Sequence, residues 1–257
     1  MQMKTHLMLL GMLALALLTA ACGQTQERAD GPAPDTSEEA PEAVAMELAP
    51  MTEESAAARA AFAAALETLL EEHVLPDGTA AEGDLSADRF AVCDVDGDGA
   101  EELILLHEAD IMAGQTAYVF GCNQETGEMY AQLTEFPDLT FYASGAVQAG
   151  WSHNQGKGGS FWPYTLYRYD AYRDLYTEVG SVDAWDQAQF PEDYPAASDP
   201  SGSGFVYYIS TCGDFSWDDP VDESIYLGWR YPYVRGGQTL APEYLPLNAE
   251  YVHLLES

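Results

Sequence analysis

Residues 89–108 read RFAVCDVDGDGAEELILLHE, which is two apolar runs joined by an acidic loop. The runs RFAVC, residues 89–93, and LILL, residues 103–106, are rich in the residue types that favour β-strands. Gly99 permits the positive φ angle of a sharp turn between them. The stretch therefore predicts a strand–loop–strand unit whose loop carries three aspartates.

The chain after this unit continues as strands separated by turns. Enrichment in Tyr and Val, with alternation of polar and apolar residues, supports the strands, and turn residues such as 123–127 separate them. No segment of helix length lies between strands, so the spacing favours antiparallel meanders over parallel crossovers. With a helix preceding them, these strands predict an α+β fold, an N-terminal helix packed on a mostly antiparallel sheet system. The predicted strands are RFAVCD, ELILLHE, AYVFGC, MYAQLTE, LTFYA, AVQAGW, YTLYRYD, YTEVGSVDAW and GFVYYIS.

The helix is predicted over residues 52–75, TEESAAARAAFAAALETLLEEHVL. Thr52 can cap its N-terminus, and the Pro-Asp-Gly turn at 76–78 ends it. A second, short helix is predicted to begin at Asn248, and the acidic segment 214–224 is predicted to be a solvated loop. The first helix has an apolar stripe on one face, which needs a sheet to cover. The stripe consists of Phe62, Leu66, Leu69, Leu70 and Val74.

Five positions of the acidic loop can bind a metal ion. Counted from Asp94 as position 1, Asp96 and Asp98 stand at positions 3 and 5, Ala100 at position 7 and Glu102 at position 9. Calcium takes about 6–8 oxygen ligands, mostly from carboxylates and carbonyls, whereas magnesium tends to keep its waters. Carboxylates this close repel one another without a cation, so the loop predicts a calcium site. The alternative is an acidic turn without an ion, since Asp and Gly are common turn residues.

Leu105 at position 12 distinguishes this loop from an EF-hand, which has a bidentate Glu there. The DxDxDG pattern between two strands, over about residues 90–106, resembles the FG-GAP repeats of integrin-α-type β-propellers. The resemblance implies a calcium-binding loop. The chain carries one copy, whereas propellers are built from several, so a full propeller is not expected. No nucleophile or base stands near the loop, and the predicted role of the ion is therefore structural.

Residues 1–21 are predicted to be a lipoprotein signal peptide. Their apolar run, from about residue 7 to 18, is too short for a membrane-spanning helix, which needs about 20 apolar residues. The sequence TAAC at 19–22 resembles a bacterial lipobox, which implies cleavage before Cys22 and its lipidation. The alternative is an ordinary secretory peptide. Both interpretations predict an extracytoplasmic protein, and the first anchors it to the cell membrane.

Residues 22–51 are rich in Ala, Pro and acidic residues and are predicted to be a disordered linker. Residues 52–257 then form a single extracytoplasmic domain. The formal net charge of -34 argues against nucleic acid as a partner and suits cation binding and solubility. The expected contact with the membrane is the lipid on Cys22.

Cysteines are not expected to be the main source of stability. Cys93, Cys122 and Cys212 remain when Cys22 is lipidated, so at most one internal disulfide can form, and the spacing does not choose its partners. The spacings expected of a zinc site do not occur.

The aromatic, glycine-rich segment 150–170, GWSHNQGKGGSFWPYTLYRYD, is the candidate ligand surface. Aromatic rings such as Trp162 can stack on sugar faces, while His153, Asn154 and Gln155 can hydrogen-bond hydroxyl groups. The alternative is that these aromatic residues are ordinary strand residues. His153 could also serve as a general base, but it needs a partner carboxylate, which the sequence does not single out.

The sequence names no reaction, because it has no GxSxG, SxxK or HExxH motif. The lipobox, acidic linker, Ala-rich helix, DVDGDG loop and aromatic segment together resemble a group of lipoproteins of gut Firmicutes. The predicted function is that of a lipid-anchored cell-surface module with a structural calcium loop, which binds a glycan or protein partner. The alternative is an extracellular hydrolase of cell-wall or dietary polymers with a site near His153.

Overall fold

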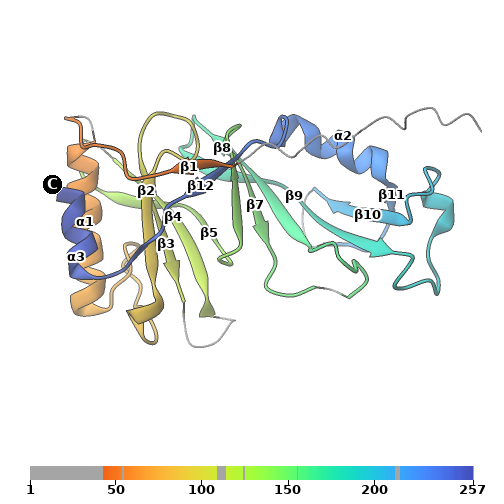
Figure 1. Ribbon diagram of the computed structural model, residues 1–257, viewed down its shortest axis with the longest axis horizontal. Helices are drawn as coiled ribbons and strands as arrows, with labels where there is room; N and C mark the ends of the chain where they lie inside the picture. Colours follow the sequence, from red (N-terminus) through yellow and green to blue (C-terminus); the bar gives the residue numbers. More distant parts are fainter. Residues whose placement is uncertain are drawn as a thin grey trace, which may run out of the picture. The chain divides into compact units, whose positions relative to one another are not determined.

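The computed structural model describes residues 43–53, 55–108, 114–123, 125–154, 156–211 and 215–256. These residues form three α-helices and two mostly antiparallel β-sheets, as Figure 1 shows, which confirms the α+β class. Neither sheet closes into a barrel, and the described residues form no propeller. The predicted signal peptide and Cys22 lie outside the described residues.

The five-stranded sheet contains the unit that carries the acidic loop. Its strand order is β13-β2-β3-β4-β5, and every neighbouring pair is antiparallel. Strands β2 to β5 follow one another along the chain, which confirms the predicted meander. The strands are β2 (Arg89–Cys93), β3 (Glu102–His107), β4 (Thr116–Cys122), β5 (Met129–Glu135) and β13 (Leu245–Pro246).

The eight-stranded sheet has the order β1-β12-β6-β7-β8-β9-β10-β11. Strands β6 to β10 form a second antiparallel meander, and the pairing of β1 with β12 is parallel. The strands are β1 (Val44–Met46), β6 (Leu139–Tyr142), β7 (Ala146–Gly150), β8 (Tyr164–Asp170), β9 (Leu175–Asp186), β10 (Phe205–Ser210), β11 (Val221–Asp222) and β12 (Thr239–Pro242).

Strand β1 lies inside the range predicted to be a disordered linker. Val44 pairs with Leu240 and Met46 with Pro242. Regular structure therefore begins before residue 52. A three-residue strand has almost no sequence pattern of its own, and its partner comes from near the other end of the chain.

Helix α1 (Ala56–Glu72) lies within the predicted range 52–75. The N-cap is Ser55, whose side chain makes no capping hydrogen bond, so the prediction of Thr52 at this position was wrong. Thr52 lies one turn earlier, where its Oγ1 accepts a hydrogen bond from the Ser55 N–H at 3.1 Å. The helix ends at His73, which adopts the left-handed conformation with φ 55°.

The five-stranded sheet is buried on both faces, which explains its continuous apolar runs. Leu103 and Leu105 of β3 belong to a core shared with α1 and the short helix α3 (Ala249–Val252). Ile104 and Leu106 point the other way, into a core shared with the eight-stranded sheet. Figure 1 shows α1 and α3 against the first of these faces. Asn248 caps α3, which confirms the predicted C-terminal helix.

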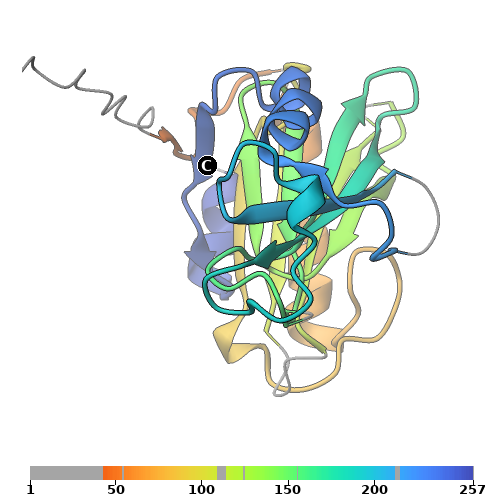
Figure 2. The same cartoon turned by 90° about the vertical axis from the view of Figure 1, so that its right-hand side faces the viewer.

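Helix α2 (Glu223–Val234) packs on the eight-stranded sheet and was not predicted. Its Tyr226 stacks on Tyr207 of β10 with ring centroids 4.0 Å apart. Figure 2 shows this helix beside the strands. The prediction of a loop over residues 214–224 was therefore wrong at its end, where β11 and the first turn of α2 form. Pro232 inside the helix disguised its pattern.

Candidate metal centre

The acidic loop joins two hydrogen-bonded strand ends. Cys93, the last residue of β2, pairs with Glu102, the first residue of β3, so the loop between them is tightly closed. Gly97 and Gly99 have φ angles of 83° and 93°, conformations that favour glycine. The strand–loop–strand prediction is confirmed at this point of the fold.

Hydrogen bonds within the loop fix the directions of its carboxylates. Asp94 accepts from the Gly97 N–H at 2.7 Å and from the Gly99 N–H at 3.1 Å. Asp96 Oδ1 accepts from the Asp98 N–H at 3.1 Å. Asp98 Oδ1 in turn accepts from the backbone N–H of Ala100, the predicted carbonyl ligand, at 2.7 Å. Each aspartate thus accepts hydrogen bonds from the backbone and still has lone pairs free for a metal ion.

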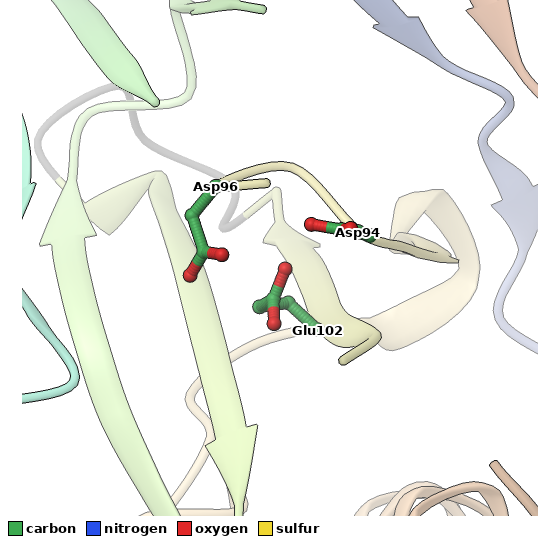
Figure 3. A group of neighbouring side chains, drawn as sticks. All are labelled: Asp94, Asp96 and Glu102. Carbon is green, nitrogen blue, oxygen red and sulfur yellow. The ribbon is translucent and has the colours of Figure 1, made fainter. Parts of the chain in front are cut away.

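Asp94, Asp96 and Glu102 form the first acidic group. One carboxylate oxygen of each lies within 4.8 Å of the others, and Figure 3 shows the three side chains converging. Asp96 is 7% exposed and Glu102 2% exposed. Glu102 Oε2 accepts from the Val95 N–H at 3.0 Å, whereas the buried Asp96 Oδ2 has no hydrogen-bond partner.

Burial and repulsion disfavour the charged forms of Asp96 and Glu102. Burial, and then the neighbouring carboxylate of Asp98, raise the pKa of Asp96 to about 7. Burial, followed by the charge of Asp96, raises the pKa of Glu102 to about 10. A divalent cation held by these carboxylates would lower both pKa values, because it would place the opposite charge against them. The oxygen-only donor set suits calcium, so the residues fit the ion that the sequence predicts.

Asp98 belongs to a second acidic group, with Asp96 and a residue that the sequence analysis missed. Asp174, in the turn between β8 and β9, brings a carboxylate oxygen within 4.8 Å of those of Asp96 and Asp98. No local signal marks Asp174, because it lies far along the chain in an ordinary acidic turn. Four of the five predicted ligands therefore supply carboxylates to two groups that share Asp96.

The predicted ligand surface is partly ordered by its own hydrogen bonds. Trp162 is 49% exposed, and its Nε1 donates to the Trp151 carbonyl at 2.7 Å. Asn154 Oδ1 accepts from the Gly156 N–H at 2.6 Å, and its Nδ2 donates to the Phe161 carbonyl at 3.5 Å. Gln155 lies outside the described residues. Asn154 thus shapes the loop, and Trp162 remains about half exposed.

His153 has a hydroxyl neighbour but no carboxylate partner among the described residues. Its Nδ1 lies 3.2 Å from Ser152 Oγ. A histidine that acts as a general base is usually oriented by a third group, often a carboxylate. The described part of the chain does not build that arrangement around His153.

Asp183 of β9 is a buried carboxyl group near this loop. It has no exposed surface, its Oδ1 accepts from the Ala184 N–H at 2.7 Å, and its Oδ2 has no partner. Burial raises the pKa of Asp183 to about 6, above its usual value of 3.8. The native state thus holds this proton more tightly than the unfolded chain does.

Asp183→Asn is expected to stabilise the protein at pH 7.5 by on the order of 2 kcal/mol and to have little effect at pH 4. Since the folded-state pKa of Asp183 is raised, its protonated form contributes to folding stability below pH 4. This stability is lost as the pH rises through about 6. Urea unfolding of the variant and the wild type at both pH values measures the difference. An equal effect at both pH values would contradict the burial argument.

The cysteines form no zinc-like group in the described residues. Cys93 is buried and free, and Cys122 is free and half-buried. Cys22 and Cys212 lie outside the described residues, so the predicted lipidation stays a prediction. None of the described helices has the length and apolar character needed to cross a membrane.

Comparisons of the chain with protein-family models, with curated proteins and with solved structures give no match. The FG-GAP and lipoprotein resemblances of the sequence therefore stay predictions. The function has to be argued from the chain's own residues.

Proposed function

We propose that the protein is a lipid-anchored, extracytoplasmic binding module whose acidic loop holds a structural calcium ion. The observation that carries the proposal is Asp96, a buried carboxylate with an unpartnered oxygen beside Asp94 and Glu102. A buried charged group without a partner is costly, and native proteins rarely keep one. A calcium ion at this point gives the oxygen its partner and offsets the repulsion among the three carboxylates.

The position of the loop supports a structural role for the ion. The proposed ligands run from Asp94, directly after β2, to Glu102, the first residue of β3, so the bound ion ties the two strand ends together. Glu102 is both a ligand and the first residue of β3. Outside the cell, where calcium is abundant, a dissociation constant of about 10⁻⁴–10⁻³ M is enough for occupancy.

An aromatic cluster supports the binding role. Trp151 contacts Phe215 edge-on with ring centroids 5.1 Å apart, and Phe215 contacts Trp217 in the same way at 5.6 Å. Trp162 is hydrogen-bonded to the Trp151 carbonyl and is about half exposed. Such rings are rigid and amphipathic, which suits stacking on a sugar face or on a partner protein. This surface favours binding over hydrolysis, as does the fact that no carboxylate of the described residues is paired with His153.

A binding screen against glycans and peptidoglycan fragments tests the proposal, in calcium and in chelator. The wild type is expected to bind one polymer class in calcium and to bind it more weakly in chelator. Trp162→Ala is expected to lower the affinity about tenfold or more, as does truncation of a tryptophan that becomes buried in an interface.

Tyr172→Ala is the matched control for this screen, since Tyr172 is a 97% exposed aromatic residue in the β8–β9 turn, outside the proposed surface. It is expected to bind like the wild type. Binding that survives Trp162→Ala unchanged, or that falls equally in both variants, would remove Trp162 from the ligand surface. Release of sugar products during the screen would favour the hydrolase instead.

A further inference from the structure

The second acidic group joins the two sheets. Asp96 and Asp98 belong to the loop of the five-stranded sheet, and Asp174 belongs to the β8–β9 turn of the eight-stranded sheet. One carboxylate oxygen from each lies within 4.8 Å of the other two. Three carboxyl groups from two separate sheets thus meet at one point, where repulsion between their charged forms would push the sheets apart.

A pocket of about 310 Å³ opens beside this group, and its lining is acidic. No Lys, Arg or His is among the lining residues, all of which the structure describes. Glu101 is the one lining acid with a cationic partner, since Arg59 binds it. None of the other lining acids forms an ion pair with a Lys, Arg or His that the structure describes. The acidic lining residues are Asp98, Glu101, Glu102, Glu125 and Asp174.

Two buried oxygen atoms at this point have no hydrogen-bond partner. Asp96 Oδ2 is one, and Gln132 Oε1 is the other. Gln132 lines the pocket, is only 5% exposed and donates from Nε2 to Asp174 Oδ1 at 2.6 Å. Since nearly all buried polar atoms in proteins are paired, the unpaired amide oxygen of Gln132, whose side chain already contacts Asp174, points to a missing cation at this group.

Asp174 is held as a metal-ligating carboxylate usually is. It accepts hydrogen bonds from Gln132 Nε2, from the Tyr169 hydroxyl at 2.7 Å and from the Tyr130 hydroxyl. The Tyr169 hydroxyl also lies 3.0 Å from Asp98 Oδ2. A carboxylate has about four lone-pair positions, so three donors orient it and leave about one position for an ion.

We infer that Asp96, Asp98 and Asp174 bind a second divalent cation, next to the ion of the DVDGDG loop and sharing the Asp96 carboxylate with it. Gln132 Oε1, which is buried and has no hydrogen-bond partner, is the candidate neutral ligand. All these donors are oxygen atoms, which selects a hard cation such as calcium. The inference rests on the proposed calcium loop, and its consequence is that calcium fastens the β8–β9 turn to the five-stranded sheet.

Calcium stoichiometry of the full-length chain, measured by equilibrium dialysis, tests the inference. The wild type is expected to bind two equivalents. Asp174→Asn is expected to keep one and to weaken the other by at least about tenfold. Asparagine tolerates the left-handed backbone of Asp174, which has a φ angle of 54°, so the turn is preserved. Glu178→Gln, an exposed change of equal charge on β9, is the matched control and is expected to bind two equivalents.

Amide hydrogen exchange separates ligation from simple folding effects. Calcium is expected to slow exchange in the β8–β9 turn of the wild type and of Glu178→Gln, but not of Asp174→Asn. One equivalent in the wild type, unaffected by Asp174→Asn, overturns the second site and leaves the loop site standing. If the wild type binds one equivalent and Asp174→Asn binds it more weakly, the second site is also overturned, and a single ion shared by both acidic groups replaces it. No calcium binding in the wild type overturns the loop site and the second site together.

Discussion

Calcium is expected to raise the unfolding temperature of the wild-type chain by about 5–10 °C when its free concentration is about 100 times the dissociation constant. An ion that binds only the folded state at this excess adds about 2.7 kcal/mol of stability. For a domain of this size, each kcal/mol moves the midpoint by about 2–4 °C. Thermal unfolding followed by circular dichroism, in chelator and in calcium, measures the shift.

Asp96→Asn is expected to lose most of this shift because Asp96 belongs to both acidic groups. In chelator the variant is expected to be more stable than the wild type, by on the order of 1 kcal/mol. The change removes one of several clustered negative charges. It also gives the unpartnered Oδ2 position an N–H₂ group that can donate to Asp94 or Glu102.

Glu67→Gln is the control for Asp96→Asn, since Glu67 is exposed on α1 and the change in charge is the same. It is expected to show the full calcium shift. A wild-type midpoint that does not move between chelator and calcium would remove the structural ion. A full shift in Asp96→Asn would place the ion elsewhere in the chain.

The strands could be predicted from the sequence because each carries its pattern locally. Residues 102–107 form a strand, and the apolar run at 103–106 predicted it before any partner was known. The structure adds that both faces of this strand are buried. Turn residues at 123–127 and 97–99 then marked where the chain reverses. The nine predicted strands all form, and the two meanders follow from their short connections.

What the sequence could not predict depends on partners far along the chain. Strand β1 becomes a strand only through Leu240 to Pro242 of β12. Helix α2 leaves Leu227 and Tyr231 exposed and contains Pro232, so its apolar pattern is weak. The same limit applies at the metal centre. The loop acids were predicted because their spacing is local, whereas Asp174 reaches them only after both sheets are formed.

Arg59→Met is expected to destabilise the protein by about 3–5 kcal/mol, the range for breaking a buried ion pair. Arg59 lies on α1, is 1% exposed, and binds Glu101 of the acidic loop through Nε at 2.7 Å and Nη2 at 2.5 Å. Its Nη2 also donates to the Ala49 carbonyl at 2.7 Å. Methionine fills the space but leaves the Glu101 carboxylate largely buried without a partner. Urea unfolding in chelator measures the loss.

The double variant Arg59→Met/Glu101→Met is expected to recover most of that loss, because no unpaired charge then remains in the site. Arg89→Met is the contrasting control. Arg89 pairs with Glu108 at the surface, where their side chains are 48% and 33% exposed, so its loss is expected to cost only about 0–1 kcal/mol. A double variant as unstable as Arg59→Met would mean that Arg59 acts through its bond to Ala49 instead. Glu101 directly precedes the proposed ligand Glu102, so the double variant is also expected to bind calcium more weakly. Weaker binding would mean that α1 helps to position the metal centre.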